Sequence, residues 1–188
     1  ENVETSYLID LDCNSLYPYV MQSHMLPYEN FSWLSAKDLE ELDIENLPEE
    51  GEIGYILEVS LEYPEHLHNV QAHCDLPLAV ERKIVPTSEL SDLTAELKQK
   101  FGSRTSNVSK LIASFHPKHN YVVHYLTLQL YLKLGLKLVS VHRAMKFRQV
   151  NWMASYIQFN AKQRQLSSTN FQSMFFKLLS NSVFGKSM

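Results

Sequence analysis

The most regular pattern of apolar and polar residues lies between Ile53 and Tyr63. Every second residue there is apolar, and these residues share one face: Ile53, Tyr55, Leu57, Val59, Leu61 and Tyr63. Alternation with a period of two is typical of a β-strand with one buried face. We therefore predict a strand over this range.

Shorter patterns predict the other elements. Tyr7–Asp12 is expected to form a short buried strand that ends in carboxylates, and Leu111–Phe115 and Leu136–Phe147 have strand-like composition. Helices are expected over Ser15–Met25, Lys37–Leu42, Ser91–Lys100, Tyr121–Leu134 (closed by Gly135), Trp152–Gln165 and Phe171–Met188. The remainder of residues 29–51, residues 64–86 and Gly102–Ser109 are expected to be irregular, and Ser167–Asn170 to form a turn. This mixture predicts an α+β fold that ends in a helical hairpin.

The composition places the chain among ordinary globular proteins. Of its 188 residues, 45% are hydrophobic and 20% are charged, which suits one domain or part of a larger one. Two cysteines, Cys13 and Cys74, cannot form a disulfide framework, so we expect a reducing compartment. No apolar run is long enough to span a bilayer, and no signal-peptide pattern is present. We therefore expect an intracellular protein with no membrane partner.

Charge is distributed very unevenly along the chain. The residues up to Glu96 include 21 acidic and 3 basic ones, a net charge of −18, whereas those from Leu97 onward include 14 basic and no acidic ones. Solubility alone does not require a stretch of about ninety residues that contains no carboxylate. Lys and Arg neutralise phosphates and release counterions, so the C-terminal half is expected to face a polyanion.

Two short motifs carry the candidate chemistry. The first is Asp-Cys-Asn-Ser-Leu-Tyr-Pro at residues 12–18, where a carboxylate precedes a predicted helix. Such a carboxylate can bind Mg²⁺ while the following backbone amides face phosphate oxygens, although an isolated Asp in this place more often caps a helix.

The second motif is Lys-Leu-Leu-Ser-Asn-Ser-Val-Phe-Gly-Lys at residues 177–186. On a helix, Lys177, Asn181 and Phe184 share one face. A cation, an amide and an aromatic ring could contact the triphosphate, sugar and base of a nucleotide. The alternative for this segment alone is a basic surface helix with Phe and Leu packed inward.

Together the motifs resemble motif A (Asp-x-x-Ser-Leu-Tyr-Pro) and motif B (Lys-x-x-x-Asn-Ser-x-Tyr/Phe-Gly) of family B DNA polymerases, in the order found in that family. The Asp-x-Asn-Ser-Leu-Tyr-Pro variant looks most like the protein-primed branch of phage, adenovirus-like and Polinton/Maverick transposon enzymes. Asn120–Tyr125 and Leu134–Lys137 are also similar to the transposon and viral enzymes. The resemblance therefore spans nearly the whole chain.

The resemblance implies roles for the residues of motif A. Asp12 would be the catalytic carboxylate that binds both Mg²⁺ ions, and Cys13 would contribute its backbone carbonyl to the metal. The amides around Ser15 and Leu16 would hold the triphosphate. Tyr17 would exclude a ribose 2′-hydroxyl. The implied reaction is two-metal addition of a dNTP to a primer 3′-hydroxyl on a DNA template.

Motif B and the helix before it would supply the remaining contacts. Lys177 would neutralise the triphosphate, Asn181 would lie near the nucleotide, and Phe184 with Gly185 would pack beneath the nascent base pair. Phe184 stands where many relatives have Tyr. A second phosphate-binding cation is expected on the preceding helix, with Arg164 preferred and Lys162 as the alternative. Ser182 and Lys186 would contact DNA.

The resemblance also implies an organisation into four segments. Residues 1–28 would be a palm strand and motif A, and residues 29–109 a palm insertion resembling a terminal-protein region, with a strand at 52–63. Residues 110–149 would add palm or insertion strands and a helix, and residues 150–188 the fingers helices. The fold would thus be a partial palm, with a mixed or antiparallel sheet, an insertion and a helical-hairpin fingers segment. A terminal protein is a candidate primer.

Two features of the family, the proofreading exonuclease and motif C, are not found in this sequence. The Asp-Thr-Asp of motif C, which supplies further metal ligands, is not found, because no acidic residue follows Glu96. This piece alone is therefore expected to be inactive. The alternatives are a non-catalytic remnant that binds DNA through its basic half, and an unrelated phosphotransferase or nucleic-acid-binding domain.

Overall fold

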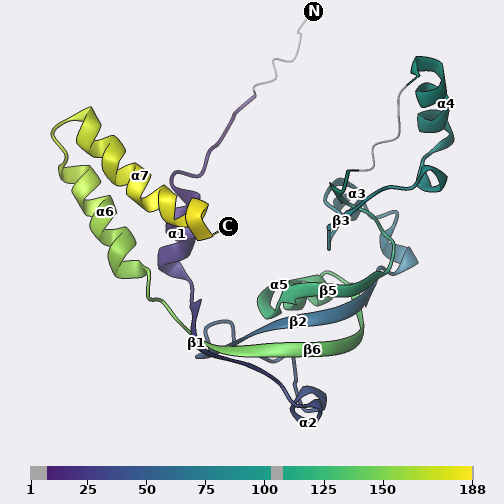
Figure 1. The fold of residues 1–188 in the computed structure, drawn as a ribbon, viewed down its shortest axis with the longest axis horizontal. Coiled ribbons are helices and arrows are strands. Elements are labelled where there is room, and N and C mark those ends of the chain that lie inside the picture. The colour runs from purple at the N-terminus through teal and green to yellow at the C-terminus, as the bar shows by residue number, and fades with distance from the viewer. Residues whose placement is uncertain (1–7, 103–107, 188) are drawn as a thin grey trace, which may run out of the picture. The chain divides into compact units, whose positions relative to one another are not determined.

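The computed structural model describes residues 8–102 and 108–187, which form two compact units. Unit 1 consists of the residues up to Ser32, Pro48–Gly54 and the residues from Lys146 onward. Unit 2 consists of Trp33–Leu47 and Tyr55–Met145. A four-stranded antiparallel sheet, helices and a C-terminal helix pair confirm the α+β prediction (Figure 1).

The four-stranded sheet has the order β1-β6-β2-β5, and β3 and β4 form a second, two-stranded sheet. The strands are β1 (Leu26–Trp33), β2 (Ile53–Glu62), β3 (Glu81–Lys83), β4 (Lys110–Ile112), β5 (Lys118–His124) and β6 (Lys137–Val150). The helices are α1 (Leu16–Ser23), α2 (Ala36–Glu40), α3 (Gln71–Asp75), α4 (Asp92–Phe101), α5 (Tyr125–Lys133), α6 (Ala154–Leu166) and α7 (Asn170–Ser187), with short 3-10 helices η1 (Glu65–Leu67) and η2 (Thr87–Glu89). None of the helices in these ranges is long and apolar enough to cross a membrane.

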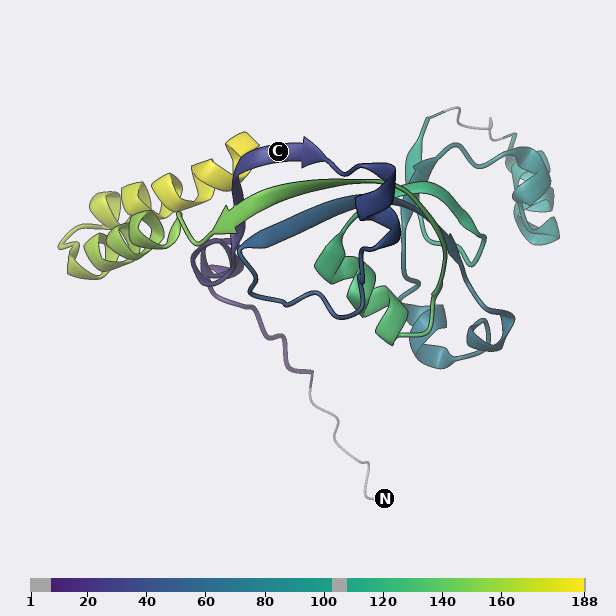
Figure 2. The ribbon, with the colours of Figure 1, turned by 90° about the horizontal axis from the view of Figure 1, so that it is seen from below.

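The core of unit 2 lies between the sheet and α5. β2 buries Leu57, Val59 and Leu61, as the predicted alternation requires, whereas Ile53 at the start of the strand is 40% exposed. α5 lies against one face of the sheet (Figure 2) and adds Leu128 to the same cluster. Gln129 of α5 is also buried, and its side-chain amide donates to two carbonyl oxygens of the loop after α2, those of residues 44 and 47, each at 2.8 Å. Apolar burial and this satisfied amide together attach the loop to the core.

One predicted helix begins later than its pattern indicates. The prediction of a helix over Tyr121–Leu134 is wrong for its first four residues, which belong to β5 and pair with β2. Val122 and Val123 are β-branched and favour a strand, and the pairing to β2 satisfies their backbone groups. The predicted closure at Gly135 is confirmed, because this glycine has φ 101° and its amide donates to the Leu132 carbonyl.

His124 ends β5 and caps α5 in its neutral form. Its Nδ1 accepts a hydrogen bond from the Leu126 amide, and burial lowers the pKa of the His124 imidazole below its ordinary value. Since the folded-state pKa is the lower one, the unfolded chain binds the proton first on acidification. The contribution to stability is therefore present above the unfolded pKa of about 6.5 and is lost as the pH falls through the folded value.

Replacing His124 with asparagine should weaken this pH dependence, because Asn also accepts a capping hydrogen bond but does not titrate. We expect the free energy of unfolding to fall less between about pH 7.5 and about pH 5.5 in His124→Asn than in the wild type. Urea denaturation at both pH values measures the difference. Equal losses in the two proteins would show that another group is responsible.

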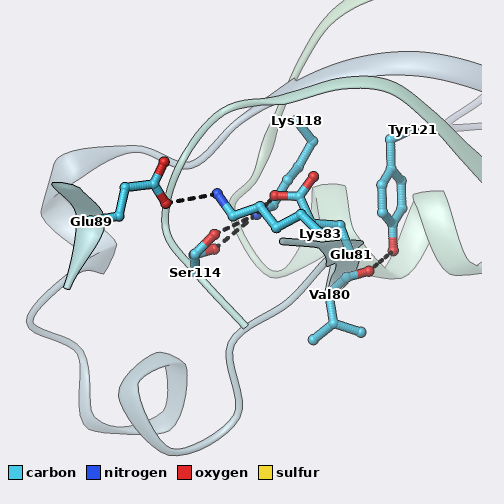
Figure 3. A network of polar contacts seen from close by, with 7 residues as sticks. All are labelled: Val80, Glu81, Lys83, Glu89, Ser114, Lys118 and Tyr121. Atoms are coloured by element: carbon cyan, nitrogen blue, oxygen red, sulfur yellow. Dashed lines mark hydrogen bonds and ion pairs between the residues drawn. The ribbon is translucent and has the colours of Figure 1, made fainter. Parts of the chain in front are cut away.

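A buried ion pair connects β5 to β3 within unit 2 (Figure 3). The Lys118 side chain is only 2% exposed, and its ammonium group lies 3.1 Å from a carboxylate oxygen of Glu81. It also donates to the hydroxyl and the carbonyl oxygen of Ser114, at 2.8 Å and 3.2 Å. Beside it, the Tyr121 hydroxyl donates to the Val80 carbonyl, and burial raises the pKa of this phenol. A buried ammonium with three acceptors is a satisfied structural group.

The predicted strand before motif A is wrong. No regular structure is found over Leu8–Asp12, and Tyr7 lies outside the described residues. Leu8, Ile9 and Leu11 are exposed by 104%, 75% and 87%. A strand requires a neighbour for its backbone hydrogen bonds, and the described sheets provide none beside this segment. The prediction rested on the apolar composition of this segment alone, and no described strand pairs with it.

The remaining element predictions have mixed outcomes. Helices near the predicted positions are confirmed as α1, α2, α4, α6 and α7, and strands as β4 and β6. The prediction of irregular structure is wrong for β1 and for the short elements η1, α3 and β3. Residues 103–107 of the predicted loop and Met188 of the last helix lie outside the described residues. The four-segment division into palm, insertion and fingers stays a prediction.

Candidate nucleotide-binding site

Motif A runs from an extended segment into the first turn of α1. Ser15 directly precedes the helix in a left-handed conformation, with φ 55° and ψ 41°, and its carbonyl accepts a hydrogen bond from the Tyr19 amide. This backbone region is strained for residues other than glycine, and such strain is concentrated at functional sites. The bend leaves Asp12 before the helix and Tyr17 on its first turn.

Motif B lies on α7, which packs against α6 as the second helix of the C-terminal pair (Figure 1). Within unit 1, α1 contacts both helices. The Tyr156 hydroxyl of α6 donates to the Leu179 carbonyl of α7, at 3.3 Å. The side-chain Nδ2 of Asn151, just before α6, donates to the Gln22 carbonyl of α1, at 2.5 Å. These hydrogen bonds hold together the three helices that carry the two motifs.

The two motifs meet at one pocket of about 360 Å³, here called the motif pocket. It is lined by Asp12, Asn14, Ser15, Leu16, Tyr17, Pro18, Arg164, Lys177 and Asn181. Seven of the residues assigned from the resemblance are among them, although the chain separates Asp12 from Lys177 by 165 positions. Close placement of both motifs follows from the packing of α1 on α6 and α7.

The charged side chains of the motif pocket suit an anionic ligand that lies beside a bound metal cation. Asp12 is its one carboxylate, whereas Arg164 and Lys177 contribute two positive charges. Neither basic side chain forms an ion pair with another described residue, so both can bind a ligand. Guanidinium and ammonium groups are the usual partners of phosphate oxygens.

An aromatic pair also links motif A to motif B. The rings of Tyr17 and Phe184 stack with centroids 4.2 Å apart and planes 5° from parallel. Tyr17 is 56% exposed, so the pair offers ring surface to a ligand. Stacked rings of this kind can support a sugar or a base.

A second pocket, of about 430 Å³, adjoins the first between the three helices and is here called the helix pocket. Its lining is Asn14, Ser15, Pro18, Tyr19, Gln22, Ile157, Asn160, Ala161, Arg164, Gln165, Ser173, Phe176, Lys177, Ser180 and Asn181. Arg164 and Lys177 line both pockets.

The other predicted site residues lie outside both linings. Lys162 is exposed on α6 but lines neither pocket, in contrast to Arg164. Cys13 is exposed next to Asp12. On α7, Gly185 has open space where a Cβ would stand, Lys186 is exposed, and the Ser182 hydroxyl donates to the Leu179 carbonyl. These roles stay predictions.

The donor set of the motif pocket fits Mg²⁺ only in part. No group of three or more His, Cys, Asp or Glu side chains gathers anywhere in the described ranges, and Asp12 stands alone as a carboxylate. Protein Mg²⁺ sites commonly use one or two carboxylates and complete their octahedron with substrate phosphates and water. Asp12 can therefore supply one oxygen ligand in the motif pocket, which Arg164 and Lys177 also line.

Sequence reasoning assigned no ligand-binding role to Asn14 or Asn160, which line the pockets. Asn14 lies within motif A, but the resemblance implies no role for it. For Asn160 a signal existed, since Ile157, Asn160 and Arg164 recur at helical spacing and share one face. A polar residue within such a stripe is a candidate for a buried functional group.

An α+β protein whose pocket combines two cations, a carboxylate and one ring of a stacked aromatic pair belongs to the class expected to bind nucleotides. Comparison with known families is specific: the family described as DNA polymerase type B, organellar and viral, matches residues 3–187. The chain therefore belongs to the family B DNA polymerases of the organellar and viral type. No curated protein and no solved structure matches it.

Proposed function

We propose that this chain forms the nucleotide-binding part of the polymerase core of a protein-primed DNA polymerase from a mobile element or virus. The observation that carries the proposal is the motif pocket, in which Asp12 and Tyr17 of motif A lie with Lys177 and Asn181 of motif B. Membership of the family implies nucleotidyl transfer with Mg²⁺, DNA and dNTPs. The Asn-Ser-Leu-Tyr-Pro form of motif A and the long stretch between the motifs favour protein priming. We further propose a nuclear or virus-associated location.

Each side of the motif pocket has a proposed task in binding the incoming nucleotide. Arg164 and Lys177 would hold the triphosphate, together with the backbone amides around Ser15 and Leu16. Holding the phosphates from two sides orients the α-phosphate for in-line attack, which is the main contribution of a protein to phosphoryl transfer.

The ring pair would position the sugar and the base. Tyr17 would occupy the space of a ribose 2′-hydroxyl, and Phe184 behind it would keep the Tyr17 ring in place through their stacking. Asp12 and the Cys13 carbonyl would hold Mg²⁺. Bound Mg²⁺ supplies activation of the primer 3′-hydroxyl and stabilises the charge of the leaving pyrophosphate.

Replacing Lys177 with alanine tests the proposed phosphate contact. Loss of a charge-assisted hydrogen bond of about 1.5–3 kcal/mol should raise the Michaelis constant for dNTP roughly 10- to 100-fold in the intact polymerase. Affinity for primer–template DNA should change much less. Primer extension at varied dNTP concentration and a DNA-binding titration measure the two quantities.

Three further results complete this test. Lys100→Ala removes an exposed charge on α4 in unit 2 and should leave the Michaelis constant unchanged. Arg164→Ala should raise it more than Lys162→Ala, because only Arg164 lines the pockets. An unchanged constant in Lys177→Ala would refute the proposal, and DNA binding without dNTP binding would favour the non-catalytic remnant.

A further inference from the structure

The helix pocket contains a buried amide to which the proposed reaction assigns no role. Asn160 of α6 is 1% exposed, and neither its Oδ1 nor its Nδ2 has a hydrogen-bond partner. Both amide atoms are shielded from solvent as well. A buried polar group without a partner is destabilising, and such groups are rare in folded proteins. The unpaired Asn160 amide therefore lowers the stability of the fold, and a functional role would explain why an amide lies there.

The position of Asn160 on α6 indicates its partner. Arg164 follows four residues later, so both side chains lie on the face of α6 that lines the helix pocket. Side chains on a helix lean toward its N-terminus, so the Arg164 side chain leans over the turn that carries Asn160. A guanidinium group only donates hydrogen bonds, and the Asn160 Oδ1 is an acceptor with no donor.

We infer that Asn160 is a positioning residue for Arg164: its Oδ1 accepts a hydrogen bond from the guanidinium group when Arg164 binds the nucleotide phosphates. In the structure without nucleotide, Arg164 is exposed and the bond is not made. Phosphate in the motif pocket draws the guanidinium inward, where the amide fixes its orientation. The inference rests on the proposed function, since it requires a phosphate beside Arg164.

Replacing Asn160 with leucine separates this role from a structural one. Leucine has a similar volume and no polar atom, so the free energy of unfolding should stay the same or rise. The Michaelis constant for dNTP should nevertheless rise about three- to tenfold in the intact polymerase, with kcat changed less than twofold. Asn160→Ala, which cannot introduce a clash, should give the same change in the Michaelis constant. Steady-state primer extension and urea denaturation measure both effects.

Two comparisons identify Arg164 as the residue through which Asn160 acts. In an Arg164→Ala background, adding Asn160→Leu should have almost no further effect on the Michaelis constant. Gln158→Leu makes the same chemical change at an exposed position on α6 that lines neither pocket, and it should leave the constant unchanged.

The opposite outcomes are distinct. An unchanged Michaelis constant in Asn160→Leu, or a rise that persists in the Arg164→Ala background, would overturn the inference. If Arg164→Ala alone leaves the constant unchanged, the proposed phosphate site fails and the inference fails with it.

Discussion

Asp12→Asn is expected to abolish primer extension by the intact polymerase while leaving the protein folded. The substitution removes the one carboxylate of the motif pocket. Loss of a metal-binding carboxylate removes several kcal/mol of transition-state stabilisation, which corresponds to a rate reduction of about a thousandfold or more. Asp12 is exposed and makes no hydrogen bond or ion pair with another described residue, so the free energy of unfolding should change by less than about 0.5 kcal/mol.

The matched control for this change is Asp10→Asn. Asp10 lies two residues earlier, is also exposed and lines neither pocket, so its replacement should leave the extension rate unaltered. Single-turnover extension of a labelled primer measures both rates. Equal rates in the two variants would remove Asp12 from the catalytic set.

Glu81→Gln is expected to be the most destabilising single change of charge in unit 2. It leaves the Lys118 ammonium, with a side chain only 2% exposed, without its carboxylate. Removing one partner of a buried ion pair costs about 3–5 kcal/mol, because the remaining charge stays buried without compensation. We expect a loss at the lower end of that range, since Ser114 still accepts two hydrogen bonds from Lys118. Urea denaturation measures the free energy of unfolding.

Removing the other partner should cost less. In Lys118→Met the apolar stem still fills the core, and the Glu81 side chain is 28% exposed, so water can solvate the carboxylate. The double variant Glu81→Gln/Lys118→Met should recover part of the loss seen in Glu81→Gln. If Lys118→Met proves as damaging as Glu81→Gln, the cost arises from packing and not from an uncompensated charge.

Helical periodicity was sufficient to predict the two helices that carry the C-terminal half of the candidate site. α6 and α7 begin and end within about two residues of the predicted positions, because the polar turn between them at Ser167–Asn170 is a local signal. Motif residues Asp12, Tyr17, Lys177 and Asn181 could be predicted to act together only through the family resemblance. Their meeting depends on packing between distant segments, which local sequence does not encode.

The errors arose where pairing decides the structure. Val122 fits a helical or a strand pattern equally, and only its pairing with Glu58 of β2 makes it part of a strand. Leu8 and Leu11 have strand composition but no neighbouring strand in the described part of the chain. Asn160 could not be recognised as unpaired from the sequence, since that depends on which groups α1 and α7 bring near it.

The division of the chain between the two units has a consequence for how the polymerase folds during synthesis. Unit 2 is built from Trp33–Leu47 and Tyr55–Met145, so its residues have all been translated before motif B is made. The motif pocket instead depends on contacts between residues 165 positions apart, which are slow to form because a long loop must close. During translation, α1 can therefore pack only after α6 and α7 have been made. We expect the motif pocket, and with it nucleotide binding, to form after the core of unit 2.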